Sequence, residues 1–468
     1  MKAKKYLYLL LLSSSLLMSE SYEEFMASMD KEYSEFQTEM DKDFTKFLNK
    51  EWKAYGTKTT PVYHRPKPLT IPTLPKQLTL VKDNTSKVKL LPLEVRNEIV
   101  PTLPLILGAK KGYQQVELNF FQQSLPFNYN VKLLHSVSKV NNHSIANYWR
   151  HQSSCEVQSL IEDIQSYQQA LNLTDWHLYL LVKQLGQAIA VDENNAKLLS
   201  WFLLIKLGYD VKVGYKGNQV YLLVGLAQDV TGVPYSSIRS RRYFNFDKIK
   251  NVKTYAQSFG KNRLLNLDDN RVPYLKKEIR TRTLSFHDGL KAYQIPVTYN
   301  QNLIDLYNHY PRLTWKYYFA QNISPLTKKG LFKQLRFIMK NMTELEAVTF
   351  LLHLTQNSFS YLSDTQQFSE ERSLFFEESL NYPANDCEDR SIFFAKLVRG
   401  LLGLKVVALY YPNHLATAVA FKSKVKGDYI EKEGEQYTVC DPTYINANVG
   451  MSMSKFKGMK PIRVIPIL

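Results

Sequence analysis

The chain reads Asn-Asp-Cys-Glu-Asp-Arg-Ser at residues 385–391, immediately ahead of an apolar run from Ile392 to Leu402. This stretch predicts a helix, because Asp386 is a good N-cap residue and the apolar residues follow it directly. Cys387 then falls in the first helical turn. There the helix dipole and the backbone amides favour a thiolate over a thiol. The stretch therefore predicts a reactive cysteine at the start of a long helix.

The acidic neighbours of this cysteine mean that a helix terminus alone does not activate it. Glu388 and Asp389 oppose a negative charge on the nearby sulfur, so a base is required. Two strands are predicted at residues 405–410 and 414–421, and the second begins with His414. Alternation places three alanines of this strand on the same face as His414. We expect these small side chains to let the cysteine helix approach the histidine closely.

A third strand is predicted at residues 436–441, and it ends in Asp441. A carboxylate at this point can orient the imidazole of His414. Cys387, His414 and Asp441 follow one another at equal separations of 27 positions. A lone cysteine or histidine is usually structural. The combination, on a helix start and two successive strands, is what indicates a catalytic triad.

These residues resemble the transglutaminase-like superfamily of papain-like Cys-His-Asp thiol enzymes, in its secreted bacterial type. The resemblance rests on Asp-Cys-Glu-Asp-Arg (386–390), Asn-His-Leu-Ala-Thr-Ala-Val (413–419) and Cys-Asp-Pro-Thr-Tyr (440–444), and it covers roughly residues 340–450. It implies an α+β fold in which an antiparallel sheet packs on the cysteine helix.

The resemblance also implies acyl transfer from an amide. Cys387 attacks the carbonyl carbon, His414 transfers the proton, and Asp441 holds the imidazole, after which the acyl group passes to water or to an amine. The oxyanion that develops needs hydrogen-bond donors. The backbone amide of Cys387 is one candidate donor, and Gln356, on a helix predicted at residues 344–357, is the second. An exposed glutamine on a helix is more often only solvated.

Aromatic and acidic residues are frequent in the segment 361–382, ahead of the cysteine helix. We expect this segment to form a lid or a wall of the substrate site, with Tyr382, Asp386 and Phe376 as its candidate residues. A packed connecting loop would account for the same pattern.

The N-terminus has the features of an export signal. Residues 1–5 are basic, residues 6–18 are mostly apolar, and residues 19–21 are small or acidic. This order predicts a signal peptide at residues 1–21 and a bacterial protein that is exported, either to the periplasm or to the medium. The apolar stretch is shorter than the about 20 residues that span a bilayer. No integral membrane segment is therefore expected after cleavage.

An 11-residue repeat follows the signal. Met-Asp-Lys-Glu-Tyr-Ser-Glu-Phe at 29–36 recurs as Met-Asp-Lys-Asp-Phe-Thr-Lys-Phe at 40–47. A period of 11 keeps the apolar residues on one stripe of a nearly straight helix, predicted here at residues 22–56. This helix either docks on the body of the protein or binds an envelope partner. Residues 57–79 contain five prolines and predict a stiff linker.

The two larger parts of the chain share a similar segment. The segment 207–220 aligns without gaps on 402–415, an offset of 195, which places Gln219 opposite His414. We infer a duplication in which residues 80–250 form a degenerate transglutaminase-like half and residues 251–468 carry the triad. Chance similarity of two helix-strand units is the alternative, because such units are common.

Composition and charge limit the classes of partner that the sequence predicts. The formal charge is +17, but the basic residues are scattered and match no nucleic-acid-binding motif, so a solvated basic surface is expected, with an anionic envelope polymer as the alternative. No phosphate-binding loop or metal-ligand spacing is present, and neither a metal nor another cofactor is expected. Three cysteines do not form a disulfide framework. Pairing of Cys155 with Cys440 stays open.

Together these features predict an exported thiol-dependent amide hydrolase or acyltransferase of the peptidase, amidase or transglutaminase type. Its substrate would be a protein or a peptide, including a peptidoglycan stem peptide, and no nucleic acid is expected. Hydrolysis is preferred, because water is abundant. The alternative is a non-catalytic envelope binding or assembly protein that keeps the fold, and a chaperone-like adaptor that depends on residues 22–55 is a third hypothesis.

Overall fold

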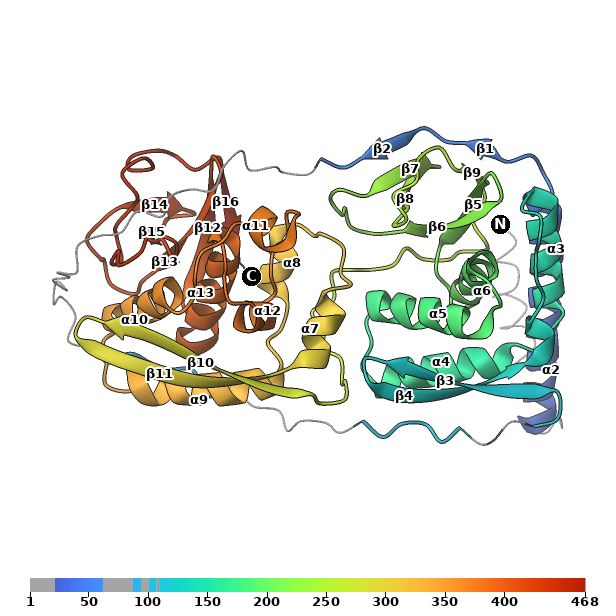
Figure 1. Cartoon of the computed structure of the whole chain (residues 1–468), viewed down its shortest axis with the longest axis horizontal. Coiled ribbons are helices and arrows are strands. Elements are labelled where there is room, and N and C mark those ends of the chain that lie inside the picture. The colour runs from blue at the N-terminus through green and yellow to red at the C-terminus, as the bar shows by residue number, and fades with distance from the viewer. Residues whose placement is uncertain (1–21, 62–86, 94–100, 107, 109, 468) are drawn as a thin grey trace, which may run out of the picture.

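The computed structural model describes residues 22–61, 87–93, 101–106, 108 and 110–467. The predicted signal peptide, and the linker beyond residue 61, lie outside the described residues. The chain forms two α+β halves that lie end to end, each with a long hairpin, a group of helices and an antiparallel sheet (Figure 1). The predicted α+β class is therefore confirmed.

The N-terminal half begins with the hairpin of β3 (Tyr113–Phe120) and β4 (Gln123–Asn130). A short 3₁₀ turn (Val131–Leu133) leads to its helices, which are α3 (Asn142–Ser153), α4 (Gln158–Ala170), α5 (Asp175–Ile189) and α6 (Glu193–Lys206). Its sheet has the order β1-β9-β5-β6-β8-β7-β2. The strands are β1 (Lys53–Ala54), β2 (Thr57–Thr59), β5 (Val211–Lys216), β6 (Gln219–Gly225), β7 (Pro234–Ile238), β8 (Arg241–Phe244) and β9 (Lys253–Thr254).

The C-terminal half begins with the hairpin of β10 (Ile279–Asp288) and β11 (Lys291–Asn300). Its helices are α7 (Gln301–Tyr307), α8 (Trp315–Ala320), α9 (Pro325–Met339), α10 (Glu344–Asn357), α11 (Asp364–Phe368), α12 (Phe376–Asn381) and α13 (Cys387–Leu402). The sheet has the order β14-β15-β13-β12-β16. Its strands are β12 (Lys405–Tyr411), β13 (His414–Ala420), β14 (Tyr429–Lys432), β15 (Glu435–Cys440) and β16 (Arg463–Pro466).

The order of elements in the first half recurs in the second. An offset of 195 maps β6 onto β13 residue for residue, and it maps β5 onto all of β12 except Lys405. The pairing also recurs, because Val224 faces Phe244 between β6 and β8, and Val419 faces Thr438 between β13 and β15. Descent from a duplication stays a prediction, but the recurring register is what it requires.

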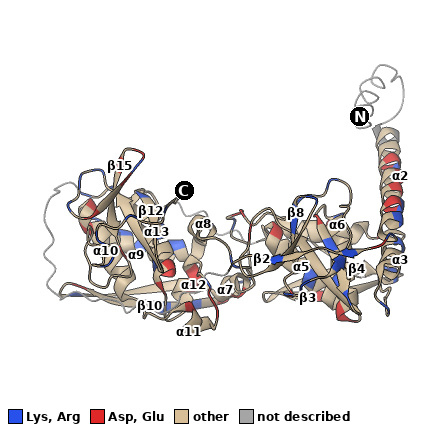
Figure 2. Ribbon diagram, turned by 90° about the horizontal axis from the view of Figure 1, so that it is seen from above, with Lys and Arg blue, Asp and Glu red and all other residues tan. Residues whose placement is uncertain are grey.

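The C-terminal part of α2 (Tyr22–Leu48) docks on the N-terminal half. Phe44 is buried, and its ring centroid lies 4.8 Å from that of Trp149. Asp41 is buried too and forms an ion pair of 2.7 Å with Lys206 of α6. The earlier turns carry the 11-residue stripe into solvent, and Figure 2 shows them standing away from the body. The repeat therefore predicts the helix, but only part of it docks. The predicted end at residue 56 is wrong, because the helix ends at Leu48 and Lys53–Ala54 forms β1, which pairs with β9.

Two predicted boundaries shift. Thr57–Thr59, assigned from sequence to the linker, is strand β2 and pairs with β7. The N-terminal sheet also extends past residue 250, because β9 pairs with β5 and the isolated bridges join Tyr209 to Arg263 and Leu226 to Leu265. Sheet pairing between segments distant in sequence decides the structure at both points.

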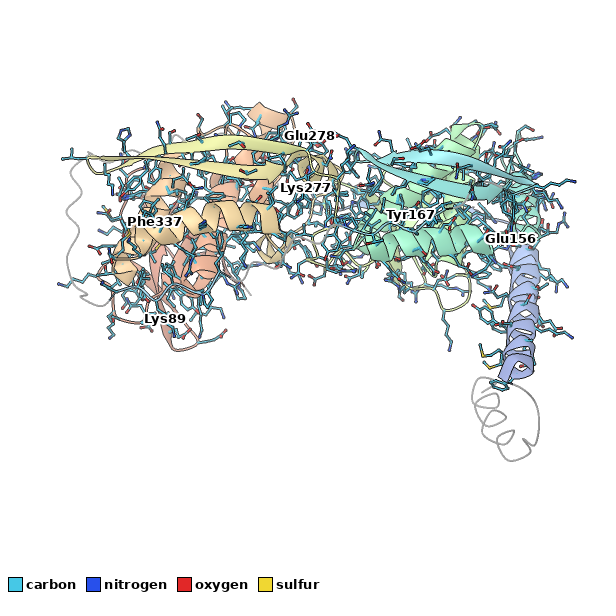
Figure 3. The ribbon with its side chains drawn as sticks, turned by 90° about the horizontal axis from the view of Figure 1, so that it is seen from below. Lys89, Glu156, Tyr167, Lys277, Glu278 and Phe337 are labelled. Carbon is cyan, nitrogen blue, oxygen red and sulfur yellow. The ribbon has the colours of Figure 1, made fainter. Side chains whose placement is uncertain are left out.

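Direct contacts join the two halves at the near ends of their hairpins, where Figure 3 labels Lys277 and Glu278. Gln122, in the turn between β3 and β4, donates a hydrogen bond to Glu278. Further inside, His177 of α5 is buried and its Nε2 lies 2.7 Å from the hydroxyl of Tyr310. Burial lowers the pKa of His177 to about 3, so this contact involves a neutral imidazole. Among the described residues, no helix is long and apolar enough to cross a membrane.

The docking of α2 yields a stability prediction. Phe44 is 3% exposed, whereas Phe36 on the same helix is 58% exposed. We expect Phe44→Ala to lower the free energy of unfolding by about 3–5 kcal/mol, because it leaves a cavity against Trp149. We expect Phe36→Ala to change it by less than about 0.5 kcal/mol. Urea unfolding followed by tryptophan fluorescence measures both, and equal effects would contradict the docking.

Candidate functional site: a buried thiol, imidazole and carboxylate

Helix α13 starts at Cys387, as the sequence predicts. Asp386 is extended, with φ −99° and ψ −160°, and precedes the first turn. The carboxylate of Asp389 accepts the backbone N–H of Asp386 at 3.2 Å and that of Leu374 at 2.8 Å. Asp389 therefore holds the start of the helix from inside its first turn.

The predicted triad residues converge. His414 is the first residue of β13, and Asp441 directly follows β15, which pairs with β13. The Nε2 atom of His414 lies 2.8 Å from Oδ2 of Asp441. The backbone N–H of Leu415 donates to Sγ of Cys387 at 3.4 Å. The sulfur therefore contacts the backbone of the residue that follows the histidine.

The second ring nitrogen of His414 differs from the first in its hydrogen bonding. Its Nδ1 is buried and has no hydrogen-bond partner within the described part of the chain. A buried polar atom without a partner costs free energy. The structure thus holds one nitrogen of the imidazole with a carboxylate and leaves the other as a proton acceptor or donor.

The expectation about the alanines of β13 is wrong. Ala416 and Ala418 pack in a cluster with Tyr411 and Phe456, on the side of the sheet away from α13. The side chains of β13 that contact the helix side are larger, such as Leu415. Large apolar side chains exclude water from a helix-sheet interface better than alanines do, so the helix packs on that face.

Glu388 acts on the thiol directly. The Cys387 sulfur donates a hydrogen bond of 3.3 Å to Oε2 of Glu388, and both side chains are buried. A carboxylate at this distance disfavours a thiolate. The arrangement therefore holds the proton on sulfur, as the acidic neighbours suggested, and makes activation depend on His414.

A C-terminal segment covers the site. The ring of Phe456 stacks on the imidazole of His414, with centroids 5.0 Å apart and planes 5° apart. Tyr411 stacks on Phe456 in turn, at 4.7 Å. Cys387, His414 and Asp441 are exposed by 0%, 1% and 2%. The site is therefore closed, and a molecule from solution reaches the thiol only when the covering segment moves.

Gln356, the predicted oxyanion donor, is buried and lies beside the triad strand in a different role. Its Nε2 donates to the backbone oxygens of Asp441 at 3.0 Å and Ala447 at 3.1 Å. Both amide hydrogens are thereby engaged. Gln356 positions the backbone that follows β15, and as placed it offers no N–H to an oxyanion.

The predicted substrate-wall residues divide among three environments. Phe376 is buried and stacks on Phe393 of α13, with centroids 4.5 Å apart, so it belongs to the core. Tyr382 is half-buried at the surface, and its hydroxyl donates to Asn308 at 2.9 Å. Asp386 is buried beside Cys387. Only Asp386 lies next to the thiol.

Several carboxyl groups are buried behind the start of α13. Burial, together with the negative charge of neighbouring carboxylates, raises the pKa of Asp364 and Asp389. Burial also raises the pKa of Glu378 to about 7, although the guanidinium of Arg372 opposes the shift. Part of this cluster is therefore protonated near neutral pH.

The same cluster has the spacing of a cation site. Asp364, Asp386 and Asp389 each place an oxygen within 4.8 Å of the others, and Cys387 with Glu388 extends the group. Hard cations accept such oxygen ligands. However, both oxygens of Asp389 and one of Asp364 already accept backbone N–H bonds. Protonation accounts for the cluster as well as a cation would.

Sequence reasoning missed two supports of the site. Arg390 is buried and donates to the backbone oxygens of Gln356, Phe359 and Asn385. Its sequence context gave no signal, because Arg390 stands among polar residues ahead of the apolar run that begins at Ile392. Phe456 carried no signal, because nothing in the chain around it distinguishes it from other surface-loop aromatics.

The comparisons with known proteins add nothing to this geometry. No family model matches the chain, and neither the curated proteins nor the solved structures contain a significant match to it. The site is interpreted from its own residues.

The buried carboxyl groups predict a pH dependence of stability. A glutamate with pKa about 7 in the folded state and 4.5 unfolded binds more protons when folded between those pH values. The free energy of unfolding should therefore fall as the pH rises from about 5 to 7. Glu378→Gln should flatten this slope in urea unfolding at a series of pH values. An unchanged slope would contradict the assignment to Glu378.

The cover predicts the reactivity of the thiol. We expect Phe456→Ala to speed iodoacetamide labelling of Cys387 by about tenfold or more, because local opening then costs less free energy. Met459→Ala is the control, since Met459 lies in the same segment but is 45% exposed. Mass spectrometry measures both. Labelling that responds equally to the two variants would show that Phe456 is not the cover.

Proposed function

We propose that this chain is an exported thiol-dependent amide hydrolase or acyltransferase of the transglutaminase-like type, which acts through a cysteine acyl intermediate. The observation that carries the proposal is the imidazole of His414. Asp441 holds its Nε2 at 2.8 Å, and its buried Nδ1 has no partner among the described residues. Leu415, the residue that follows His414, donates its backbone N–H to the sulfur of Cys387 at 3.4 Å. These contacts support the proposal by placing the thiol beside the residue that follows His414, and catalysis then requires Sγ to come within hydrogen-bond reach of Nδ1.

Each triad residue then has one role. Nδ1 of His414 takes the proton of Cys387, and Sγ attacks the carbonyl carbon of an amide. The C–N bond breaks as the protonated His414 gives its proton to the leaving amine. Water, or a second amine, releases the acyl group from sulfur with His414 again as the base. Asp441 stabilises the imidazolium in both steps.

The oxyanion is stabilised by backbone donors in this proposal. The first N–H groups of a helix have no acceptor within the helix, and Cys387 opens α13. Its backbone N–H is the candidate donor. The helix dipole adds to this stabilisation, because the positive end of α13 points at the reacting carbonyl. Gln356 is not included, since its amide hydrogens are engaged.

The proposed substrate is an amide in a protein or peptide, including the stem peptide of peptidoglycan. Export follows from the sequence of residues 1–21, which lie outside the described residues. Hydrolysis is preferred to transamidation because water is abundant. No metal or other cofactor has a role in these steps.

A non-catalytic binding or assembly protein is the second candidate function. It is favoured by α2, whose projecting turns expose Met26, Met29, Tyr33 and Phe36. Contiguous exposed apolar side chains mark interaction sites. The closed thiol and its acidic neighbour Glu388 are also compatible with a fold retained for its surface.

The thiol chemistry separates the two candidates. In the opened Phe456→Ala background, we expect Cys387 to be alkylated at about pH 6, since a paired thiolate persists well below the pH where a free thiol ionises. Adding His414→Ala should slow alkylation at least tenfold, and Asp441→Asn should slow it less. The rate is measured by mass spectrometry, with the buried thiol of Cys155 as the internal reference.

Two outcomes would overturn the enzyme proposal. One is alkylation of Cys387 only above about pH 8. The other is a rate that does not depend on His414. Either result would make the binding function the better account of the fold. Phe456→Leu is the matched control, because it changes the same position but keeps an apolar side chain over His414. It shows whether a substitution at residue 456 by itself disturbs the sheet around His414.

A further inference from the structure

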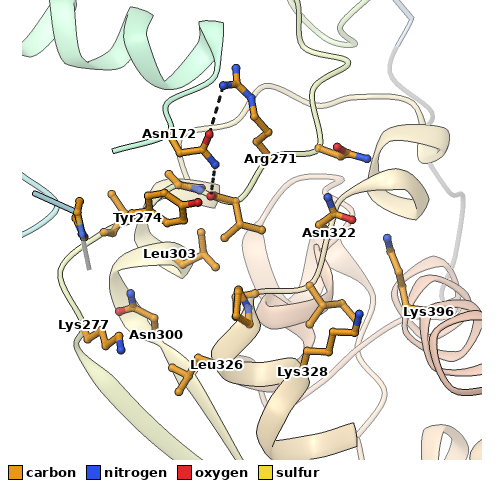
Figure 4. A pocket seen from close by; sticks show the side chains of 18 of the residues that line it. Asn172, Arg271, Tyr274, Lys277, Asn300, Leu303, Asn322, Leu326, Lys328 and Lys396 are labelled. Carbon is orange, nitrogen blue, oxygen red and sulfur yellow. Dashed lines mark hydrogen bonds between the residues drawn. The ribbon is translucent and has the colours of Figure 1, made fainter. Parts of the chain in front are cut away.

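A large cavity lies at the seam between the two halves, on the opposite part of α13 from the thiol. Its volume is about 1070 Å³, at the upper end of small-molecule sites. Its walls come from residues 270–277, which connect the halves, from the start of α9, and from Lys396, Arg399 and Gly400 of α13. Figure 4 shows Asn322, Leu303 and Tyr274 around the hollow. Gln123 and Asn172 of the N-terminal half also line the cavity, so both halves contribute to one site.

The charged residues of this cavity have one sign. Among the described residues that line it, none is acidic. Six are basic, namely Arg271, Lys276, Lys277, Lys328, Lys396 and Arg399. They come from three separate parts of the chain. Like charges brought together in a partly enclosed space repel one another, so the fold gathers them at a cost.

The described chain leaves several of these charges without a counter-ion. Arg271 pairs with Asp269 at 2.7 Å, and Lys396 donates to the backbone oxygen of Gln321. Lys276, Lys328 and Arg399 have no ion pair with any described carboxylate. A ligand that supplies negative charge would offset this repulsion.

Burial strengthens the effect on the α13 side of the cavity. It lowers the pKa of Lys396 to about 8, and the nearby charge of Arg399 lowers it further against the opposing charge of Glu377. Burial also lowers the pKa of Arg399. In a site of lower dielectric than water, an anion gains more from each cation than it would at the surface.

The rest of the lining is apolar or amide. Apolar side chains come from Leu275, Leu303, Phe319, Leu326 and Phe332, and the amides are Gln123, Asn172, Asn270, Asn300 and Asn322. Amides give a fixed set of donors and acceptors. Inorganic ions alone would leave the apolar wall unused. The lining therefore suits a ligand with an apolar or ring-shaped body and charged groups at its edges.

We propose that this cavity binds a small organic anion that carries two or more anionic groups, such as phosphates, sulfonates or carboxylates, on an apolar or ring-shaped body. Arg399 and Lys396 on α13, Lys328 on α9 and Lys276 in the connection bind the anionic groups. The bound molecule contacts both halves and therefore stabilises their arrangement. This site does not depend on the thiol chemistry, since no triad residue lines it.

The test uses pyranine, a fluorescent pyrene that carries three sulfonates, and the full-length mature protein. We expect one binding site per chain. We expect the double variant Lys328→Gln/Arg399→Gln to raise the dissociation constant for pyranine by about tenfold or more. Lys329→Gln is the matched control, because Lys329 neighbours Lys328 on α9 but is exposed and does not line the cavity. That variant should bind within about twofold of the wild type. Circular dichroism verifies that every variant is folded.

Competition tests the chemistry of the ligand. Inorganic tripolyphosphate should displace pyranine from the wild type, because it occupies the same cations. Failure to displace would show adsorption of the ring alone and overturn the proposal. Equal weakening by Lys328→Gln/Arg399→Gln and Lys329→Gln, or several sites per chain, would overturn it as well, since a basic surface and not the cavity would then bind the probe.

Discussion

The packing of α13 on β13 is the interaction on which the site depends. The hydroxyl of Ser391 donates to the backbone oxygen of Leu415 at 2.9 Å, and the backbone N–H of Leu415 donates to Cys387 at 3.4 Å. The first turns of α13 are thereby held against Leu415, whose backbone N–H and backbone oxygen both bond to the helix. Any change in the helix position moves the sulfur relative to His414. The buried side chains between them, including Ile392 and Val419, resist such a movement because interiors are close-packed.

The N-terminal half contains the same helix and strand arrangement without the cysteine and the histidine. There α6 begins after Asp192, and β6 begins with Gln219 in place of histidine. The helix end is capped by the side chain of Asp192, which accepts the N–H of Asn195 at 2.9 Å. In α13 the corresponding cap comes from inside the turn, from Asp389.

Local pattern predicted most of the second half, since each element it used is set by nearby residues. Asp386 and the apolar run located the start of α13, and Tyr-Pro-Asn at 411–413 located the turn between β12 and β13, where Asn413 has φ +56°. Period 2 placed His414 and Asp441 correctly relative to their own strands. These predictions needed no knowledge of which elements pack together.

What the sequence left out depends on packing between distant segments. The face of β13 that α13 covers could not be decided from alternation, because both faces are apolar and only residue size separates Leu415 from Ala416. Gln356 was assigned a role from its proximity in the chain, but its partners are the carbonyls of Asp441 and Ala447. Strand β2 was hidden in a proline-rich context, since its partner β7 lies far along the chain. Each outcome was set by long-range contact and not by local propensity.

The closed state of the site follows from its charges. A thiol among Glu388, Asp389 and Asp386 is stable as a thiol, and burial under Phe456 makes the neutral form more favourable still. Solvent that enters when the cover moves would screen the carboxylates and hydrate a thiolate-imidazolium pair. Opening would therefore expose the sulfur and favour its ionisation in a single step. In the proposed enzyme, the sulfur would stay unreactive until a substrate, or a partner on the cover, offsets the free energy of moving Phe456 from the imidazole.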